Sequence, residues 1–103
     1  MPGGLLECFV IKSFADPETA SVWNGRRSRR LPFEIQPAAL RKLRMLNQAR
    51  TLSDLRVPPG NRLEALKGDR RGQYSVRINQ QWRICFRWHD GAAYDVGIVD
   101  YHD

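Results

Sequence analysis

The stretch QYSVRINQQWRICFRW, residues 73–88, determines the architecture that we expect for this chain. Two runs of alternating apolar and polar side chains, 73–78 and 82–88, are separated by the polar residues 79–81. Alternation with a period of two is typical of a strand with one buried and one polar face. Because only three residues separate the runs, we predict an antiparallel hairpin.

Further strand-forming runs lie on both sides of this hairpin. Residues 62–66 precede it and residues 93–101 follow it, and the glycine-containing turns 67–72 and 89–91 separate them from the hairpin. An apolar run at 6–14 predicts one more strand near the start of the chain. The last four strands are expected to be antiparallel, because the connections between them are short.

Two helices are predicted between the first strand and the hairpins. Asp16 before Pro17 is typical of a helix N-cap followed by a proline at the first helical position, and Asn24-Gly25 predicts the end of this short helix. A basic connector, residues 26–30, follows.

The second and main helix is predicted from about Phe33 to Ala49. Its apolar positions recur at steps of three and four residues, which is typical of an amphipathic helix, and they are Ile35, Ala39, Leu43 and Leu46. Pro37 leaves two alternatives, because proline inside a helix removes a backbone hydrogen bond. Either the helix begins near Gln36 or it is kinked at Pro37.

These elements predict an α+β fold of order β-α-α-β-β-β-β, in which two N-terminal helices pack on a curved, mainly antiparallel sheet. The length of 103 residues and the 42% hydrophobic content fit one globular domain over residues 1–103. The helices are expected to cover the apolar face of the sheet. Residues 1–9 are expected to be an extension that partly joins the first strand.

The sequence also bears on location, cofactors and metals. No apolar run approaches the roughly 20 residues that span a bilayer, and the first residues lack the pattern of a signal peptide, so we expect a cytoplasmic protein with no membrane partner. Cys8 and Cys85 are far apart and lack metal-ligand spacing, so buried reduced thiols are expected. No cofactor or metal is predicted.

The charge of the chain favours a polyanionic partner. Lys and Arg together number 17 against 11 Asp and Glu, a formal net charge of +6, and 14 of the 17 cations are arginine. Arginine suits bidentate binding of phosphate. The alternative is that a GC-rich genome encodes Arg in place of Lys.

Arginines also occupy the polar face of the predicted hairpin. By alternation Arg77, Arg83 and Arg87 share the face opposite the apolar side chains, where they could hold a phosphodiester backbone. The alternative is an ordinary solvated outer face of an antiparallel sheet.

Several segments together resemble one toxin family. They are NRLEALKGDR at 61–70, QYSVRIN at 73–79, QWRICFRW at 81–88 and VDYH at 99–102. Over about residues 10–102 the chain is similar to the HigB group of the RelE/ParE toxin superfamily. The resemblance implies the toxin of a type II toxin–antitoxin pair, a ribosome-dependent endoribonuclease that cuts mRNA in the A site. Residues 1–9 and Pro37 depart from the family pattern.

The resemblance also implies partners. A HigA-type helix-turn-helix antitoxin would neutralise the toxin and repress the shared operon, so operator DNA would be contacted only through that complex. The ribosome and its mRNA would be the target.

Cleavage of RNA by its own 2′-hydroxyl needs a base, cationic support for the phosphorane and an acid for the leaving 5′ oxygen. Lys67 and Arg83 are expected outside the apolar core, where they could hold the phosphate. His102 suits proton transfer, Tyr101 could stack on a base or act as an acid, and Asp100 could orient His102 or contact the nucleotide. Strand parity places Tyr101 on the side of Arg83, and Asp100 and His102 opposite. The candidate catalytic residues are Lys67, Arg83, Asp100, Tyr101 and His102, with base and acid unassigned.

Other arginines are candidate RNA-binding residues. Those near the sheet are Arg70, Arg71, Arg77 and Arg87. A second basic surface, for which ordinary solvation is the alternative, comprises Arg26, Arg27, Arg29, Arg30, Arg41 and Arg44.

Two other functions are compatible with parts of this pattern. A ParE-like inhibitor of DNA gyrase would use the same fold, but the ending 100–102 together with Lys67 and Arg83 argues against it. A non-catalytic RNA-binding module would need only the arginine surface, and an adjacent helix-turn-helix reading frame would exclude it.

Overall fold

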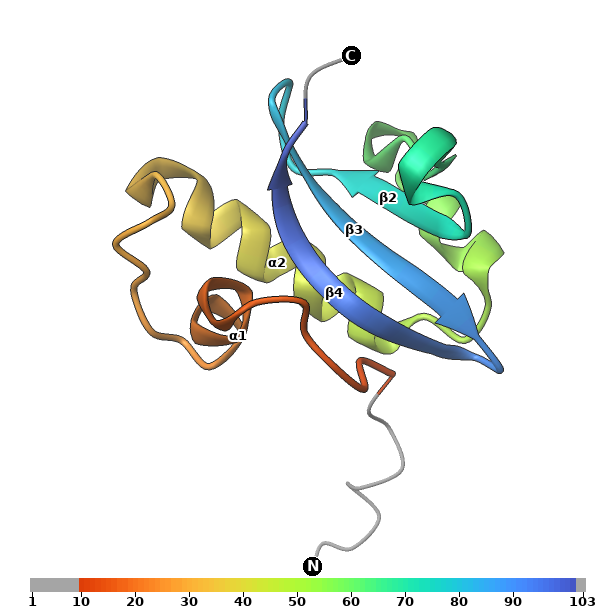
Figure 1. Cartoon of the computed structure of the whole chain (residues 1–103), viewed down its shortest axis with the longest axis horizontal. Helices are drawn as coiled ribbons and strands as arrows, with labels where there is room; N and C mark the ends of the chain where they lie inside the picture. The colour runs from red at the N-terminus through yellow and green to blue at the C-terminus, as the bar shows by residue number, and fades with distance from the viewer. Residues whose placement is uncertain (1–9, 102–103) are drawn as a thin grey trace, which may run out of the picture.

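The computed structural model describes residues 10–101, which form two helices and one four-stranded antiparallel sheet (Figure 1). The sheet has the strand order β1-β2-β3-β4, so each strand pairs with its neighbour in the sequence. The predicted α+β class and antiparallel sheet are confirmed. The elements are α1 Pro17–Trp23, α2 Gln36–Gln48, β1 Glu64–Ala65, β2 Gln73–Arg77, β3 Trp82–His89 and β4 Ala92–Asp100.

The central hairpin forms as the alternation predicts. β2 pairs with β3 so that Arg77 lies opposite Arg83. β3 continues into β4 through Asp90 and Gly91, whose φ angles are 49° and 75°. Two successive positive φ values are those of a type I′ turn, which matches the twist of the flanking strands.

The predicted first strand, residues 6–14, does not form a regular strand in the part that the structure describes. Residues 10–16 follow the edge of β4 in parallel and make isolated bridges, Ile11 to Ala93 and Phe14 to Val96. Between these bridges Asp95 has a φ of 52°, and its N–H donates to the Ser13 hydroxyl rather than to a backbone carbonyl. This local irregularity interrupts the ladder. The predicted extension at 1–9 lies outside the described residues.

Helix α1 begins and ends where the sequence predicts. The Asp16 carboxylate accepts the N–H of Thr19 at 2.7 Å, which satisfies one unpaired donor of the first turn. After Trp23 the chain turns at Gly25, whose φ of 79° lies in the left-handed region that favours glycine.

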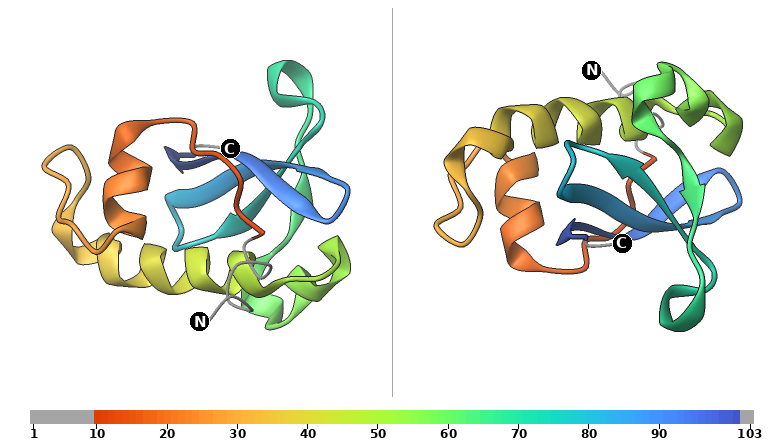
Figure 2. Two further views of the ribbon diagram at one scale, coloured as in Figure 1. Left: turned by 90° about the horizontal axis from the view of Figure 1, so that it is seen from below. Right: turned by 90° about the horizontal axis from the view of Figure 1, so that it is seen from above.

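Helix α2 begins at Gln36, so one of the two alternatives for Pro37 is confirmed. A 3₁₀ turn at Phe33–Ile35 precedes it, and Pro37 lies in the first turn, where its missing N–H costs no helical bond. The predicted apolar stripe is buried against the sheet, and Figure 2 shows α2 lying across one sheet face. No helix within residues 10–101 has the length and apolarity to cross a membrane.

Strand β1 is shorter than the predicted 62–66, because the chain turns sharply before it. A 3₁₀ turn at Pro59–Asn61 leads into Arg62, which has a left-handed φ of 46° and cannot continue a strand. Only Glu64 and Ala65 form the strand that pairs with β2, and the Leu66 N–H adds one further bond to the Gln73 carbonyl at 2.8 Å. The following turn, residues 68–72, projects from the sheet on the side away from α2 (Figure 2).

The sheet face turned away from α2 is partly buried and is not exposed to solvent along its whole length. Ser75 and Cys85, which lie opposite each other on β2 and β3, are both at most 2% exposed. Burial of the Cys85 thiol confirms that part of the cysteine prediction, whereas Cys8 lies outside the described residues.

Candidate active site

Arg83 is buried, which corrects the expectation that it lies outside the core on an open face. Only 8% of the residue is exposed. Its Nε donates to the Ser75 hydroxyl at 2.7 Å, and its Nη2 donates to the Arg62 carbonyl at 2.5 Å. The Glu64 carboxylate lies 3.8 Å from Nη2. A buried guanidinium needs such partners, because an unpaired charge is costly to remove from water.

The Arg62 carbonyl is presented to Arg83 by a loop built around Asn61. The Asn61 side chain is fully buried, its Nδ2 donates to the Leu55 carbonyl at 3.1 Å, and its Oδ1 accepts from Lys42 Nζ at 2.6 Å. Burial and the adjacent charge of Arg41 lower the pKa of Lys42. This network ties helix α2 to the turn that carries Arg62, and through it to Arg83.

Tyr101 lies beside Arg83, as strand parity predicted. The guanidinium carbon of Arg83 is 5.7 Å from the centre of the Tyr101 ring, within the range of a cation–π contact. The Tyr101 N–H donates to the Gln81 carbonyl at 2.7 Å, which extends the β3–β4 pairing one residue beyond β4. The aromatic ring is therefore held at the end of the sheet.

Two cavities meet at Tyr101 and Glu64. The first, of about 300 Å³, is lined by Arg62, Glu64, Arg77, Asn79, Gln80, Arg83 and Tyr101. The second, of about 420 Å³, is lined by Glu64, Ala65, Leu66, Lys67 and Tyr101. Four of the predicted residues line these two cavities: Arg77, Arg83 and Tyr101 line the first, and Lys67 and Tyr101 line the second. We call these two cavities together the Arg83 site.

The other predicted residues near the sheet are placed elsewhere. Asp100 is exposed, does not line either cavity, and accepts a hydrogen bond from Gln81 Nε2 at 3.1 Å. Arg87 pairs across the strands with Gln73, toward the other end of β2 from Arg77, and lies 3.6 Å from the Asp95 carboxylate. Arg87 therefore lies apart from Arg77 and Arg83 along β3, and its role in RNA binding stays a prediction. His102 lies outside the described residues.

Arg70 and Arg71 belong to the turn that projects from the sheet. Arg70 donates to the Gln73 side chain at 3.4 Å, and Arg71 is exposed. Neither residue lines the Arg83 site.

Sequence reasoning missed the residues that hold Arg83 in place. Ser75 lies on the neighbouring strand β2, Glu64 lies on β1 one strand further away, and Asn61 and Arg62 precede β1 in an irregular turn. Ser75 had a signal, since strand alternation puts it on the face of Arg83 and directly opposite Cys85. Nothing in the residue type of Arg62 indicates its left-handed conformation.

The site is rich in cations and has one carboxylate. Lys67, Arg77 and Arg83 suit a phosphate, whereas Glu64, Lys67 and Tyr101 are the lining side chains with a proton to give or accept. Within residues 10–101 no three His, Cys, Asp or Glu side chains gather as a metal site would require.

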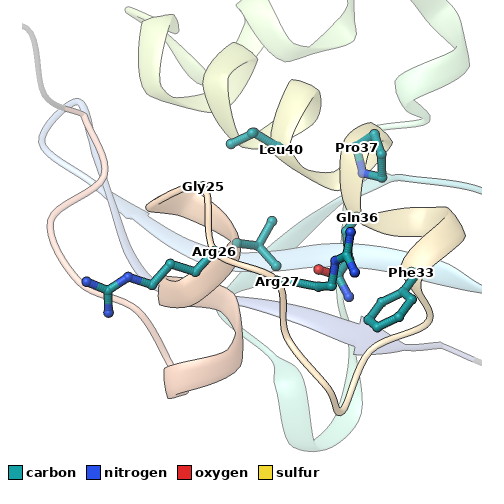
Figure 3. A pocket seen from close by; sticks show the side chains of 8 residues that line it. Gly25, Arg26, Arg27, Phe33, Gln36, Pro37 and Leu40 are labelled. Atoms are coloured by element: carbon teal, nitrogen blue, oxygen red, sulfur yellow. The ribbon is translucent and has the colours of Figure 1, made fainter.

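The second basic surface lies on the helices and their connector. All six of its arginines, at 26, 27, 29, 30, 41 and 44, are exposed. Arg26 and Arg27 line a further pocket between α1 and the start of α2 (Figure 3). This surface is built from elements other than those of the Arg83 site.

Comparison with known proteins gives a consistent result. A family model described as HigB, the RelE-like toxin of a type II toxin–antitoxin system, matches residues 12–102. The Toxin HigB-1 of Vibrio cholerae is 48% identical over 70 residues, which is 68% of this chain and 74% of that protein. The Endoribonuclease HigB of Proteus vulgaris is 44% identical over 41 residues, 40% of this chain and 45% of that protein. An uncharacterized protein of Haemophilus influenzae is 32% identical over 69 residues, 67% and 68% of the two chains.

Proposed function

Because this chain belongs to the HigB-like family of RelE-like toxins of type II toxin–antitoxin systems, we propose that it is an endoribonuclease that cleaves mRNA on the ribosome, with the Arg83 site as its active site. The name of the Proteus vulgaris relative supports RNA as the substrate. The observation that carries the location of the site is the buried, fully anchored Arg83 guanidinium beside Tyr101.

The proposed reaction is attack of a ribose 2′-hydroxyl on the adjacent phosphate. The new 2′-oxygen–phosphorus bond forms as the bond to the 5′ oxygen breaks, which leaves a 2′,3′-cyclic phosphate and a 5′-hydroxyl. Arg83 and Arg77 would hold the scissile phosphate, and Lys67 would stabilise the added charge of the phosphorane. A fixed guanidinium suits this role, because it costs little reorganisation during the reaction.

Proton transfer is proposed for residues near the end of β4. Tyr101 is positioned to stack on a base or to protonate the leaving oxygen, and His102, from its place in the sequence, would serve as the other proton-transfer group. Asp100 would orient His102 or contact the nucleotide. This scheme requires neither a metal nor a cofactor.

The ribosome is proposed as the required partner, because the Arg83 site has few groups for acid–base catalysis and the net charge of +6 favours docking on ribosomal RNA. An antitoxin of the HigA helix-turn-helix type would neutralise the toxin, and operator DNA would be bound only through their complex. Action on translating ribosomes would place the protein in the cytoplasm.

Primer extension on an mRNA incubated with the protein tests this function. Cleavage at defined codon positions is expected with translating ribosomes and not with naked mRNA. The Arg77→Ala variant serves as the matched inactive control. Arg77 is less buried than Arg83, so its removal should disturb the fold less. Efficient cutting of naked mRNA would contradict ribosome dependence. Absence of cutting together with inhibition of DNA gyrase would support the ParE-like alternative instead.

A further inference from the structure

A pocket of about 340 Å³ lies between the end of α1, the connector and the start of α2 (Figure 3). Apolar side chains and cationic side chains both line it, and the full set is Val22, Gly25, Arg26, Arg27, Phe33, Gln36, Pro37 and Leu40. Its volume is at the lower end of the range for small-ligand pockets. The mechanism proposed above makes no use of it.

The most unusual feature of the pocket is an exposed aromatic ring under an arginine. Phe33 is 54% exposed, and only Val57 is also a large exposed hydrophobic side chain in the part of the chain that the structure describes. The Arg27 guanidinium carbon is 4.7 Å from the centre of the Phe33 ring. Aromatic rings and guanidinium planes are the two groups on which proteins stack unpaired RNA bases.

The pocket is held in shape before any ligand binds. The buried Gln36 side chain donates to the carbonyls of Ser28 and Leu31 at 2.8 and 2.9 Å and accepts the Ser28 N–H at 3.0 Å. These bonds fix the connector that carries Arg27 against the turn that carries Phe33. The backbone of the connector is therefore ordered before binding, which lowers the entropic cost of binding. The same hydrogen bonds occupy the Gln36 side-chain amide. The pocket can therefore stack a base and bind phosphate, but the Gln36 amide is not available to recognise the edge of the base.

The charge around the pocket favours a polyanion. Two of the six exposed arginines of the second basic surface, Arg26 and Arg27, line it, and Arg30 has a carboxylate partner, Glu18, at 3.8 Å. An unpaired RNA segment supplies a phosphate and a planar base with every nucleotide, which matches two arginines in a pocket with one exposed ring. An acidic peptide would supply the charge but would need a separate apolar group for the ring.

We infer that this pocket binds one unpaired nucleotide of ribosomal RNA, with its base stacked on Phe33 and its flanking phosphates held by Arg26 and Arg27. The inference rests on the proposed function, since it assigns the docking contact that brings the Arg83 site to the mRNA. Binding here is independent of the mRNA codon.

Phe33→Ala, Phe33→Tyr and Arg27→Glu test this contact, with Val57→Ala as a matched control that removes the other exposed apolar side chain. Affinity for programmed ribosomes is measured by co-sedimentation, with an mRNA whose 2′-hydroxyls are replaced to prevent cleavage. The cleavage rate is measured separately in single turnovers at saturating ribosome concentration. Circular dichroism and thermal melting establish that each variant is folded.

We expect Phe33→Ala to weaken ribosome binding by about 5- to 100-fold, the usual loss for one base-stacking contact. Phe33→Tyr and Val57→Ala should bind like the wild type, Arg27→Glu should bind more weakly, and the saturated cleavage rate of Phe33→Ala should be unchanged. A photoreactive phenylalanine analogue at position 33 should cross-link to ribosomal RNA.

Three results would overturn the inference. If Phe33→Ala bound ribosomes as tightly as the wild type, the inferred contact would be disproved, whereas the proposed function would stand. Loss of antitoxin binding alone, with ribosome binding retained, would assign the pocket to a protein partner. If the wild-type chain itself neither bound ribosomes nor cleaved mRNA on them, the proposed function would fail as well.

Discussion

The Arg83 guanidinium carbon, on β3, lies 5.7 Å from the centre of the ring of Tyr101, the residue that follows β4. Arg83 is held from the other side by Ser75 and by the Arg62 carbonyl. A side chain that belongs structurally to the protein interior is thus one wall of the cavity in which chemistry is proposed. Substitution of Arg83 should therefore lower both stability and activity, whereas substitution of its neighbour Arg77 should lower activity alone.

Arg83→Ala is expected to lower the free energy of unfolding by about 3 kcal/mol, because it leaves buried polar partners unsatisfied. This cost follows from the burial of Arg83, which the sequence pattern predicts to lie outside the apolar core. Arg77→Ala is expected to change stability by no more than about 0.5 kcal/mol and still to abolish cleavage. Urea unfolding and ribosome-dependent cleavage of both variants measure the two effects. Equal stability of the two variants would contradict the structural role of Arg83.

Asn61→Ala should affect the site from a distance. Removing the side chain leaves the Leu55 carbonyl and Lys42 without their partner in a buried region, which is expected to cost about 2 kcal/mol of stability. Release of the loop should also displace the Arg62 carbonyl from Arg83 and lower the single-turnover cleavage rate. Asn24→Ala is the control, because Asn24 is exposed, and it should change neither the stability nor the single-turnover cleavage rate. Unchanged cleavage by a destabilised Asn61→Ala variant would show that the loop does not position Arg83.

Much of this fold was predictable because it follows local rules. The N-cap at Asp16, the apolar stripe of α2 and the alternation of β2 and β3 each depend on near neighbours in the sequence. The burial of Arg83 was not predictable, since it depends on a backbone carbonyl that lies 21 residues earlier. Parity correctly placed Tyr101 on the side of Arg83.

Acid sensitivity should be traceable to Asp54 in the loop after α2. Its carboxylate accepts the N–H groups of Arg50 and Thr51 at 2.9 and 3.1 Å, and these bonds lower its pKa in the folded state. The stabilisation is present above the unfolded-state pKa and is lost as the pH falls through the folded-state value. In Asp54→Asn, which can still accept hydrogen bonds but does not titrate, stability should fall less steeply between neutral and acidic pH. Urea unfolding across this pH range measures the difference, and identical pH profiles would contradict it.

The two proposed proton-transfer residues, Tyr101 and His102, can be separated by kinetics. Removal of a general acid or base slows the chemical step by about 10²- to 10⁴-fold, whereas removal of a binding contact mainly weakens affinity. His102→Ala is therefore expected to lower the single-turnover rate on saturated ribosomes and to leave ribosome affinity nearly unchanged. Tyr101→Phe keeps the ring beside Arg83 and removes only the hydroxyl, so a full rate in this variant would restrict Tyr101 to stacking. If a chain truncated after Tyr101 cleaved at the full rate, His102 would have no part in the chemistry, and proton transfer would fall to Tyr101, Lys67 or Glu64 in the Arg83 site.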